Sequence, residues 1–322
     1  MTAHDRLAFP RLSPGHILSR LFPGLSMRSG LLVLVTCLVL PVPAASQGVR
    51  KLFISADMEG ITGVVTGDQL GPGGFEYERF RKFMTEEVLA VIAAARAAGV
   101  REFLVADSHG NGENLLLELL PADVQVVRSW PRPNGMMQGI DSTFDAAVFV
   151  GYHAGTTNPA GVRAHTFSSA HLTDVRLNGR SVPEGGVNAA IAGHYGVPVI
   201  LVTGDDAAVE EVRAAIGPVE GAVVKWNYGF HSARTLTPEA GRALIAERTT
   251  AALRAPRPRP FVLRGPVTVD VTFKNYQPSQ VLALLPFVER PDAHTVRYVG
   301  PDILAVSRFL QFINTYDQNL IP

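Results

Sequence analysis

The sequence predicts an α/β protein: a mainly parallel sheet in an αβα layer domain, followed by a smaller α+β C-terminal part. From residue 49 onward, short apolar segments alternate with amphipathic segments of helical period, as in parallel sheets joined by crossover helices. The proline-rich stretch at residues 254–260 then interrupts this alternation with a stiff connector. We therefore expect the layer domain over residues 47–258 and the smaller part over residues 259–322.

The first half of this region predicts one long helix among short strands. Apolar residues recur at intervals of three and four between Phe80 and Ala95, and Gly99 ends the pattern. The segment after Val150 lacks a helical period, and Asn178-Gly179 predicts a hairpin turn within it. The expected strands are Lys51 to Ala56, one beginning at Phe103, Val124 to Val127, and Ala146 to Val150.

The second half continues the alternation on both sides of the connector. We assign each expected element from a run of apolar residues, and the period of that run decides between helix and strand. Before the connector we expect a helix at 187–192, a strand at 198–203, and helices at 206–216 and 237–253. After it we expect a strand at 261–273, a helix at 279–285, a strand at 295–299 and a helix at 303–313.

Residues 1–46 have the features of a targeting segment rather than of a folded element. A basic start at Met27, an apolar run from Leu31 to Leu40 and small residues up to Ser46 are typical of a signal peptide. The apolar run is too short to span a bilayer, so we expect no stable membrane anchor after cleavage. Residues 1–26 are either a long n-region or upstream sequence before a start at Met27. We expect a periplasmic or secreted protein.

Composition restricts the partners and the metal chemistry. Lys plus Arg equals Asp plus Glu at 29 each in the 322-residue chain, so no net charge attracts nucleic acid. The single cysteine, Cys37, lies inside the signal segment. Any metal in the mature protein must therefore be held by His, Asp and Glu, which are ligands that suit zinc.

Metal-capable side chains follow three of the expected strands where those strands end. Asp57 and Glu59 follow the first strand and project to the same side, because side chains alternate along an extended chain. His109 and His153 follow two later strands, and ligands collect at the carboxyl ends of parallel strands. Two carboxylates this close repel unless a cation lies between them. The sequence therefore predicts a metal site, with Asp57 as the natural bridge between two ions.

Each candidate also has an ordinary structural interpretation. Asp57 alone is a common turn former, and a lone histidine at a loop start is an ordinary polar residue. Glu184 precedes a helix, where the helix dipole favours a carboxylate, and Asp205 opens another helix as an N-cap. His165 by itself would be a loop histidine. It is the coincidence of several such residues at three strand ends that favours the metal site.

Seven motifs together resemble the binuclear zinc D-aminopeptidase family, the metallopeptidases associated with bacterial dipeptide-transport operons. The resemblance runs in order from about residue 50 to residue 315. The motifs are Asp-Met-Glu-Gly-Ile-Thr-Gly at 57–63, Tyr77-Glu-Arg with Met84-Thr-Glu-Glu, Asp107-Ser-His109, Gly151-Tyr-His-Ala, Pro159-Ala-Gly-Val-Arg-Ala-His165, Val182-Pro-Glu-Gly-Gly-Val-Asn188 and Gly204-Asp-Asp206.

The resemblance implies two zinc ions per subunit, bridged by Asp57, and a role for His165 in catalysis. It implies that Glu59 and His153 complete one zinc site, and that His109 and Glu184 complete the other. Asn188 and Asp205 become candidates for the substrate pocket. The resemblance also implies a ring-shaped homo-oligomer whose active sites face an enclosed space.

We therefore expect an exported zinc aminopeptidase that uses a metal-bound water to release the N-terminal residue of short peptides. The family suggests D-amino acids such as D-Ala. Two other functions stay open at this level: a binuclear metallohydrolase of another amide or of a phosphate ester, and a non-catalytic exported protein that binds metal or peptide. A phosphate-ester enzyme needs a basic clamp near the metals, for which only Arg163 is an obvious candidate.

Overall fold

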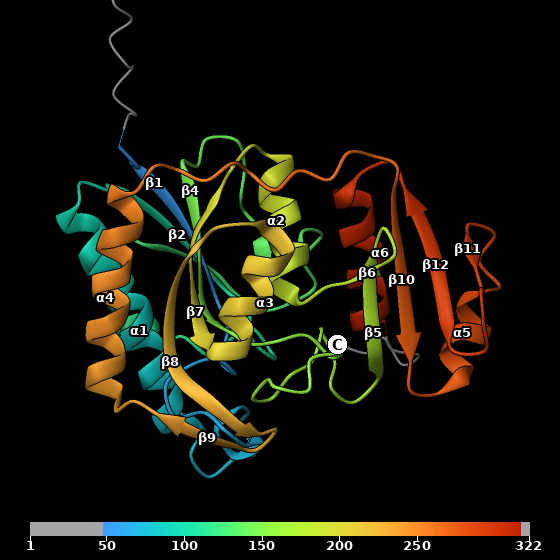
Figure 1. Ribbon diagram of the computed structural model, residues 1–322, viewed down its shortest axis with the longest axis horizontal. Coiled ribbons are helices and arrows are strands. Elements are labelled where there is room, and N and C mark those ends of the chain that lie inside the picture. Colours follow the sequence, from blue (N-terminus) through green and yellow to red (C-terminus); the bar gives the residue numbers. More distant parts are fainter. Residues whose placement is uncertain (1–47, 317–322) are drawn as a thin grey trace, which may run out of the picture. The chain divides into compact units, whose positions relative to one another are not determined.

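The computed structural model describes residues 48–316 of the chain (Figure 1). The predicted signal peptide, Cys37 and both possible start sites lie outside the described residues. Within residues 48–316, no helix is both long enough and apolar enough to cross a membrane.

A seven-stranded sheet confirms the predicted α/β class, with strand order β3-β2-β1-β4-β7-β8-β9. Its strands pair in parallel except for β9, which is antiparallel to β8. Because β1 lies between β2 and β4, the carboxyl ends of these three strands meet at one edge. The strands are β1 (Lys51–Ala56), β2 (Glu102–Asp107), β3 (Gln125–Val127), β4 (Ala146–Tyr152), β7 (Val199–Asp205), β8 (Glu220–Gly229) and β9 (Ser232–Thr235).

Helices cover both faces of this sheet, as Figure 1 shows. Side chains of α1 and α4 share one core with the sheet, and α2 packs in a second core on the opposite face. The predicted stop of α1 is confirmed, since Gly99 follows it with a φ of 105° that suits glycine. The helices are α1 (Tyr77–Ala97), α2 (Glu184–His194), α3 (Asp206–Ile216) and α4 (Pro238–Arg254).

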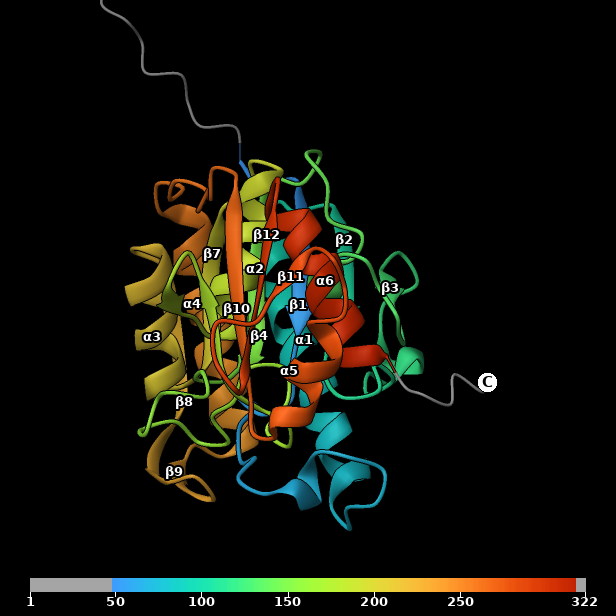
Figure 2. The ribbon, with the colours of Figure 1, turned by 90° about the vertical axis from the view of Figure 1, so that its right-hand side faces the viewer.

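A second, antiparallel sheet has the order β11-β12-β10-β5-β6. In Figure 2 the side of the molecule that carries this sheet faces the viewer. Helix α6 packs against β10, β12 and α2, and so helps to fill the space between the sheets. Asn178 and Gly179 form the predicted turn between β5 and β6, with φ values of 49° and 80°. The elements are β5 (Leu172–Leu177), β6 (Arg180–Ser181), β10 (Val267–Phe273), β11 (Val288–Glu289), β12 (Thr295–Gly300), α5 (Tyr276–Leu282) and α6 (Ile303–Thr315).

Strands β5 and β6 come from residues before the predicted boundary at 258, so the second sheet is not built from the C-terminal part alone. The division of the mature chain at that residue stays a prediction. The expected strand at 261–273 begins only at Val267, because Pro266 has no N–H to donate to a ladder. Helix α5 begins three residues earlier than expected, because Asn275 caps it by accepting from the amide of Gln277. Strands β8 and β9 were not predicted.

Candidate metal centre

The structure brings all five predicted metal ligands together at the carboxyl edge of the parallel sheet. Asp57 and Glu59 follow β1, His109 follows β2, and His153 follows β4. Glu184 is the first residue of α2 and enters from the layer beside the sheet. All five are buried, with at most 7% of their surface exposed. Five ionisable groups packed in this way must neutralise one another or share a cation.

Asp57 lies between two imidazole rings, each facing a different oxygen of its carboxylate. His109 Nδ1 is 3.2 Å from Asp57 Oδ1 and 2.8 Å from Glu59 Oε2. His153 Nε2 is 3.3 Å from Asp57 Oδ2 and 3.5 Å from Glu184 Oε2. The central position expected for Asp57 is therefore what the geometry shows.

The neighbours of Asp57 form two groups of possible ligands, and a third group joins Glu59 to His153 and His165, so the pairing of ligands within each zinc site stays a prediction. Glu59 lies with His109 on one side, and Glu184 lies with His153 on the other. Within the described part of the chain, no cluster of possible ligands contains both His109 and Glu184. The cause is the strand order, because β2 and β4 flank β1 and set their histidines on opposite sides of Asp57. The α2 terminus reaches only the His153 side.

The donor atoms fit a zinc centre. Buried Asp57 Oδ2 and His153 Nε2 find no hydrogen-bond partner among residues 48–316, as expected of atoms reserved for a cation. Backbone carbonyls orient the other ring nitrogens: His109 Nε2 contacts Leu70 O (2.7 Å), and His153 Nδ1 contacts Ala154 O (3.0 Å). Such outer contacts fix which nitrogen faces the metal. Carboxylate oxygens and imidazole nitrogens are ordinary zinc ligands.

Electrostatics in the cluster also call for positive charge. Burial raises the pKa of Asp57, and the Glu59 carboxylate raises it further. Burial acts in the same direction on Glu59, yet facing His109 holds the Glu59 pKa well below its usual range. Burial lowers the pKa of His153, but the carboxylates of Glu184 and Asp57 raise it well above its usual value. A divalent cation among these carboxylates would supply the charge that the imidazoles otherwise provide.

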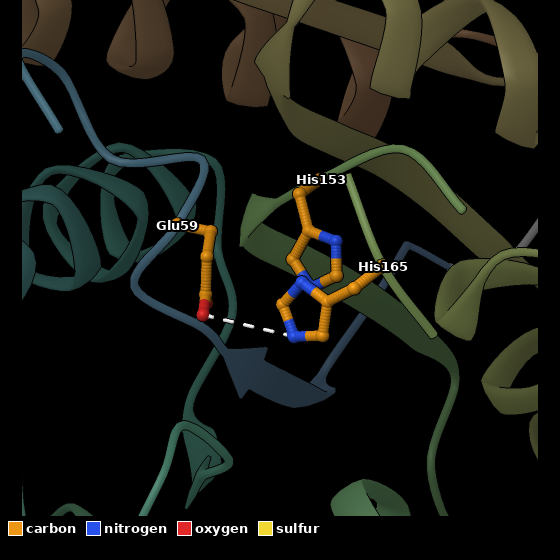
Figure 3. Close-up of side chains that lie close together, drawn as sticks. All are labelled: Glu59, His153 and His165. Carbon is orange, nitrogen blue, oxygen red and sulfur yellow. Dashed lines mark ion pairs between the residues drawn. The ribbon is translucent and has the colours of Figure 1, made fainter. Parts of the chain in front are cut away.

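His165 joins this cluster from the loop between β4 and β5, although it is distant from the strand ends in sequence. Its Nδ1 contacts Arg163 O (2.8 Å), and its Nε2 lies 3.8 Å from Glu59 Oε1 and 3.9 Å from Glu184 Oε1. The ring stacks on that of His153, with centroids 4.1 Å apart (Figure 3). Burial lowers the pKa of His165, and neighbouring His153 lowers it further. Because Glu59, His153 and His165 also form a possible ligand group, this geometry permits either catalysis or metal binding.

The two predicted substrate-pocket residues do not line the cavity. Asn188 is buried on α2 and donates to the hydroxyl of Tyr152 (2.9 Å). Asp205 is the N-cap of α3, accepting from Ala208 N (2.7 Å), and its second oxygen accepts from Val162 N (2.5 Å). Both side chains thus have hydrogen-bond partners inside the protein, and their place in the substrate pocket stays a prediction. The N-cap interpretation of Asp205 is confirmed.

A cavity of about 260 Å³ opens onto the metal-capable residues. Trp130, Met136 and Phe167 give it an apolar wall, and residues near the end of α6 give it a polar one. Arg163 is absent from its lining within the described chain, and its guanidinium instead lies 4.9 Å from the ring of Phe230. Sequence reasoning missed these residues, because no pattern along the chain places α6 beside the strand ends. The polar wall consists of Gln311, Asn314 and Thr315.

Carboxylates and imidazoles gather at the carboxyl edge of the parallel sheet and open onto a small cavity. This arrangement defines the class as a metal-dependent hydrolase with an α/β fold. Comparison with known proteins narrows it. The Peptidase_M55 family, described as D-aminopeptidase, matches residues 50–312. The chain belongs to this D-aminopeptidase family, and it is an enzyme of the zinc-dependent peptidase class.

Two relatives agree with this assignment. A D-aminopeptidase of Bacillus subtilis (strain 168) is 36% identical over 258 residues, covering 79% of this chain and 93% of the relative. The structure of the Zn-dependent D-aminopeptidase DppA from Bacillus subtilis, described as a self-compartmentalizing protease, aligns with a TM-score of 0.79 and 34% identity. That alignment covers 82% of this chain and 96% of DppA.

Proposed function

We propose that the protein is an exported D-aminopeptidase that holds two zinc ions per subunit and releases the N-terminal residue of short peptides. The observation that carries the two-ion proposal is the placement of Asp57. Each of its carboxylate oxygens faces a different imidazole, and each imidazole has a second carboxylate beside it. Glu59, His109, His153 and Glu184 would supply the other ligands of the two ions.

Zinc in such a site polarises the scissile carbonyl and lowers the pKa of a water molecule. The protein's own residues would do the rest. The carboxylates of Asp57, Glu59 and Glu184 would offset most of the positive charge of two zinc ions. His165 points its Nε2 toward the same carboxylates, with Nδ1 fixed by Arg163 O, so Nε2 is the nitrogen that can exchange a proton with the substrate.

The size and lining of the cavity support short peptides as substrates. Its volume of about 260 Å³ leaves room for only a few residues. The apolar wall formed by Trp130 and Phe167 suits a small apolar side chain, and the amides at the end of α6 suit a peptide backbone. Because Arg163 points elsewhere, the alternative of phosphate-ester hydrolysis lacks its one candidate clamp.

Location and assembly extend the proposal. The predicted signal peptide supports export to the periplasm or outside the cell. The description of DppA as self-compartmentalizing supports a ring-shaped homo-oligomer here as well. Light scattering on the mature protein would reveal the assembly, and a fully active monomer at working concentration would contradict it.

The activity is tested with mature protein, zinc-loaded or EDTA-treated, against D-Ala-D-Ala, L-Ala-L-Ala and p-nitrophenyl phosphate. We expect zinc-dependent release of alanine from D-Ala-D-Ala and little release from L-Ala-L-Ala. We expect no release of p-nitrophenol from p-nitrophenyl phosphate. Metal analysis of the loaded protein should give two zinc ions per chain. Preferential hydrolysis of the phosphate ester would support the alternative enzyme class, and binding without turnover would support a capture protein.

A further inference from the structure

A lysine ammonium group lies buried against the loop that carries Glu59. Lys225 stands in the middle of β8, in register with Asp205 at the end of β7, and none of its surface is exposed. Its Nζ donates to the backbone carbonyls of Glu59, Ile61 (3.2 Å) and Val64 (2.7 Å). An ammonium group has three donors, so these three carbonyls use all of them.

The same loop is tied to the scaffold through its amides. Only glycine fits at position 60, because a Cβ there would lie 2.1 Å from Tyr152 O. The carbonyls of this loop accept from one ammonium group, whereas its amides donate to three other elements, β4, α1 and β9. These amide bonds are Gly60 N to Gly151 O (2.7 Å), Thr62 N to Glu87 Oε1 (2.9 Å) and Gly63 N to Thr235 Oγ1 (2.9 Å).

We infer that Lys225 is a positioning residue for the metal centre, whose three hydrogen bonds fix the path of residues 59–64 and hold Glu59 beside His109. This inference rests on the proposed zinc centre. Lysine suits the position, because its compact ammonium can address three carbonyls from one point, whereas the planar fork of arginine cannot. Glu184 lies on α2, so its position does not depend on this loop.

The direction in which zinc affinity changes when Lys225 is replaced distinguishes a positioning role from a purely electrostatic one. A buried positive charge repels a metal cation, so removal of the charge alone would strengthen zinc binding. Loss of the loop's anchor would instead let Glu59 move away from His109 and weaken zinc binding on that side. The two explanations therefore predict opposite changes in zinc affinity.

The test titrates zinc into chelator-stripped wild type, Lys225→Met and Lys225→Gln, in competition with a chromophoric chelator. We expect two binding steps in the wild type. Lys225→Met should weaken one step by about 10–100-fold, as loss of an outer-shell contact does, and leave the other within about threefold. Lys225→Gln, which keeps two donors without the charge, should fall between Lys225→Met and the wild type.

Double variants identify the affected half. Added to Glu59→Ala, which already removes the ligand that the loop carries, Lys225→Met should cause little further loss. Added to Glu184→Ala, which removes a ligand on α2, it should cause its full loss. The matched control is Val267→Ala, which truncates a fully buried side chain of β10 in the second sheet. It should lower the melting temperature and leave both zinc steps unchanged.

A folded Lys225→Met protein with unchanged or tighter zinc binding would overturn the inference. Equal weakening of both steps, reproduced by Val267→Ala, would also overturn it, since that is the signature of general destabilisation. If Lys225→Met does not fold, the same zinc titration of Lys225→Gln decides, and unchanged or tighter zinc binding would again overturn the inference. If the wild type shows a single zinc-binding step, the two-ion proposal is refuted but the inference about Lys225 is not. The inference then requires that single step to weaken in both Lys225 variants.

Discussion

Glu87 offers a direct test of how burial shapes the stability of the loop beside the metal centre. It is 1% exposed on α1, and its Oε1 accepts a hydrogen bond from Thr62 N (2.9 Å). Its Oε2 has no partner among residues 48–316. Burial raises the pKa of Glu87 from 4.5 to about 7, against the opposing effects of Thr62 and Lys225. The perturbation is Glu87→Gln, which keeps the shape and removes the ionisation.

The folded state holds the Glu87 proton more tightly than the unfolded state does. Stability from this group is therefore complete below about pH 4.5 and is lost as the pH rises through about 7. At about 1.4 kcal/mol per pKa unit, the raised pKa of Glu87 lowers the free energy of unfolding by roughly 3 kcal/mol at about pH 8 and by roughly 1.4 kcal/mol at about pH 5.5. The advantage of Glu87→Gln over the wild type should therefore grow by about 2 kcal/mol between these pH values.

Urea unfolding of both proteins at the two pH values measures this change. Comparing variant with wild type cancels the titration of all other groups that the substitution leaves unaltered. Glu86→Gln is the matched control, because Glu86 lies on the same helix and pairs with Arg242 (2.6 Å) near the surface. Its effect should not grow with pH. A difference between Glu87→Gln and wild type that is the same at both pH values would refute the burial argument.

Three further outcomes concern the metal centre. Asp57→Ala should lose both zinc ions, because both halves of the proposed centre share this carboxylate, and full double occupancy after dialysis would exclude the bridging role. His165→Asn should keep its zinc and lower kcat by about 10²–10⁴-fold if the residue transfers a proton, with His171→Asn as the control on the same loop. Loss of zinc from His165→Asn would instead identify a ligand. EDTA should lower the melting temperature, since metal stabilises the folded state that binds it, whereas DTT should have no effect because the mature chain has no cysteine.

The sequence was most informative where a residue's role follows from its own segment. The apolar run from Lys51 to Ala56 and the period of α1 are local patterns, and both elements form as expected. The gathering of Asp57, His109 and His153 also followed, because the carboxyl ends of neighbouring parallel strands meet. These predictions needed only the period of the pattern and the direction of the strands.

The rest depends on which strand lies beside which. Which histidine lies nearest to Glu59 and which to Glu184 follows from β1 standing between β2 and β4, so it cannot be derived from any one segment of the sequence. Strand β8 has no clean alternation of buried and exposed residues, and Lys225 in it resembles a surface lysine until the loop above it is known. Asn188 and Asp205 were placed near the substrate by resemblance, but their hydrogen bonds point into the scaffold.

The wall that α6 contributes to the cavity has a consequence for timing. The metal-capable residues lie between positions 57 and 184, whereas Gln311, Asn314 and Thr315 belong to the last helix of the described chain. A polypeptide still being synthesised therefore acquires its complete ligand set long before the pocket around it can close. A chain cut before residue 303 would keep every candidate ligand in its sequence but would lose the α6 side chains that share a core with α2, the helix that carries Glu184. The last helix therefore supports one ligand of the centre from behind while it also closes the pocket in front.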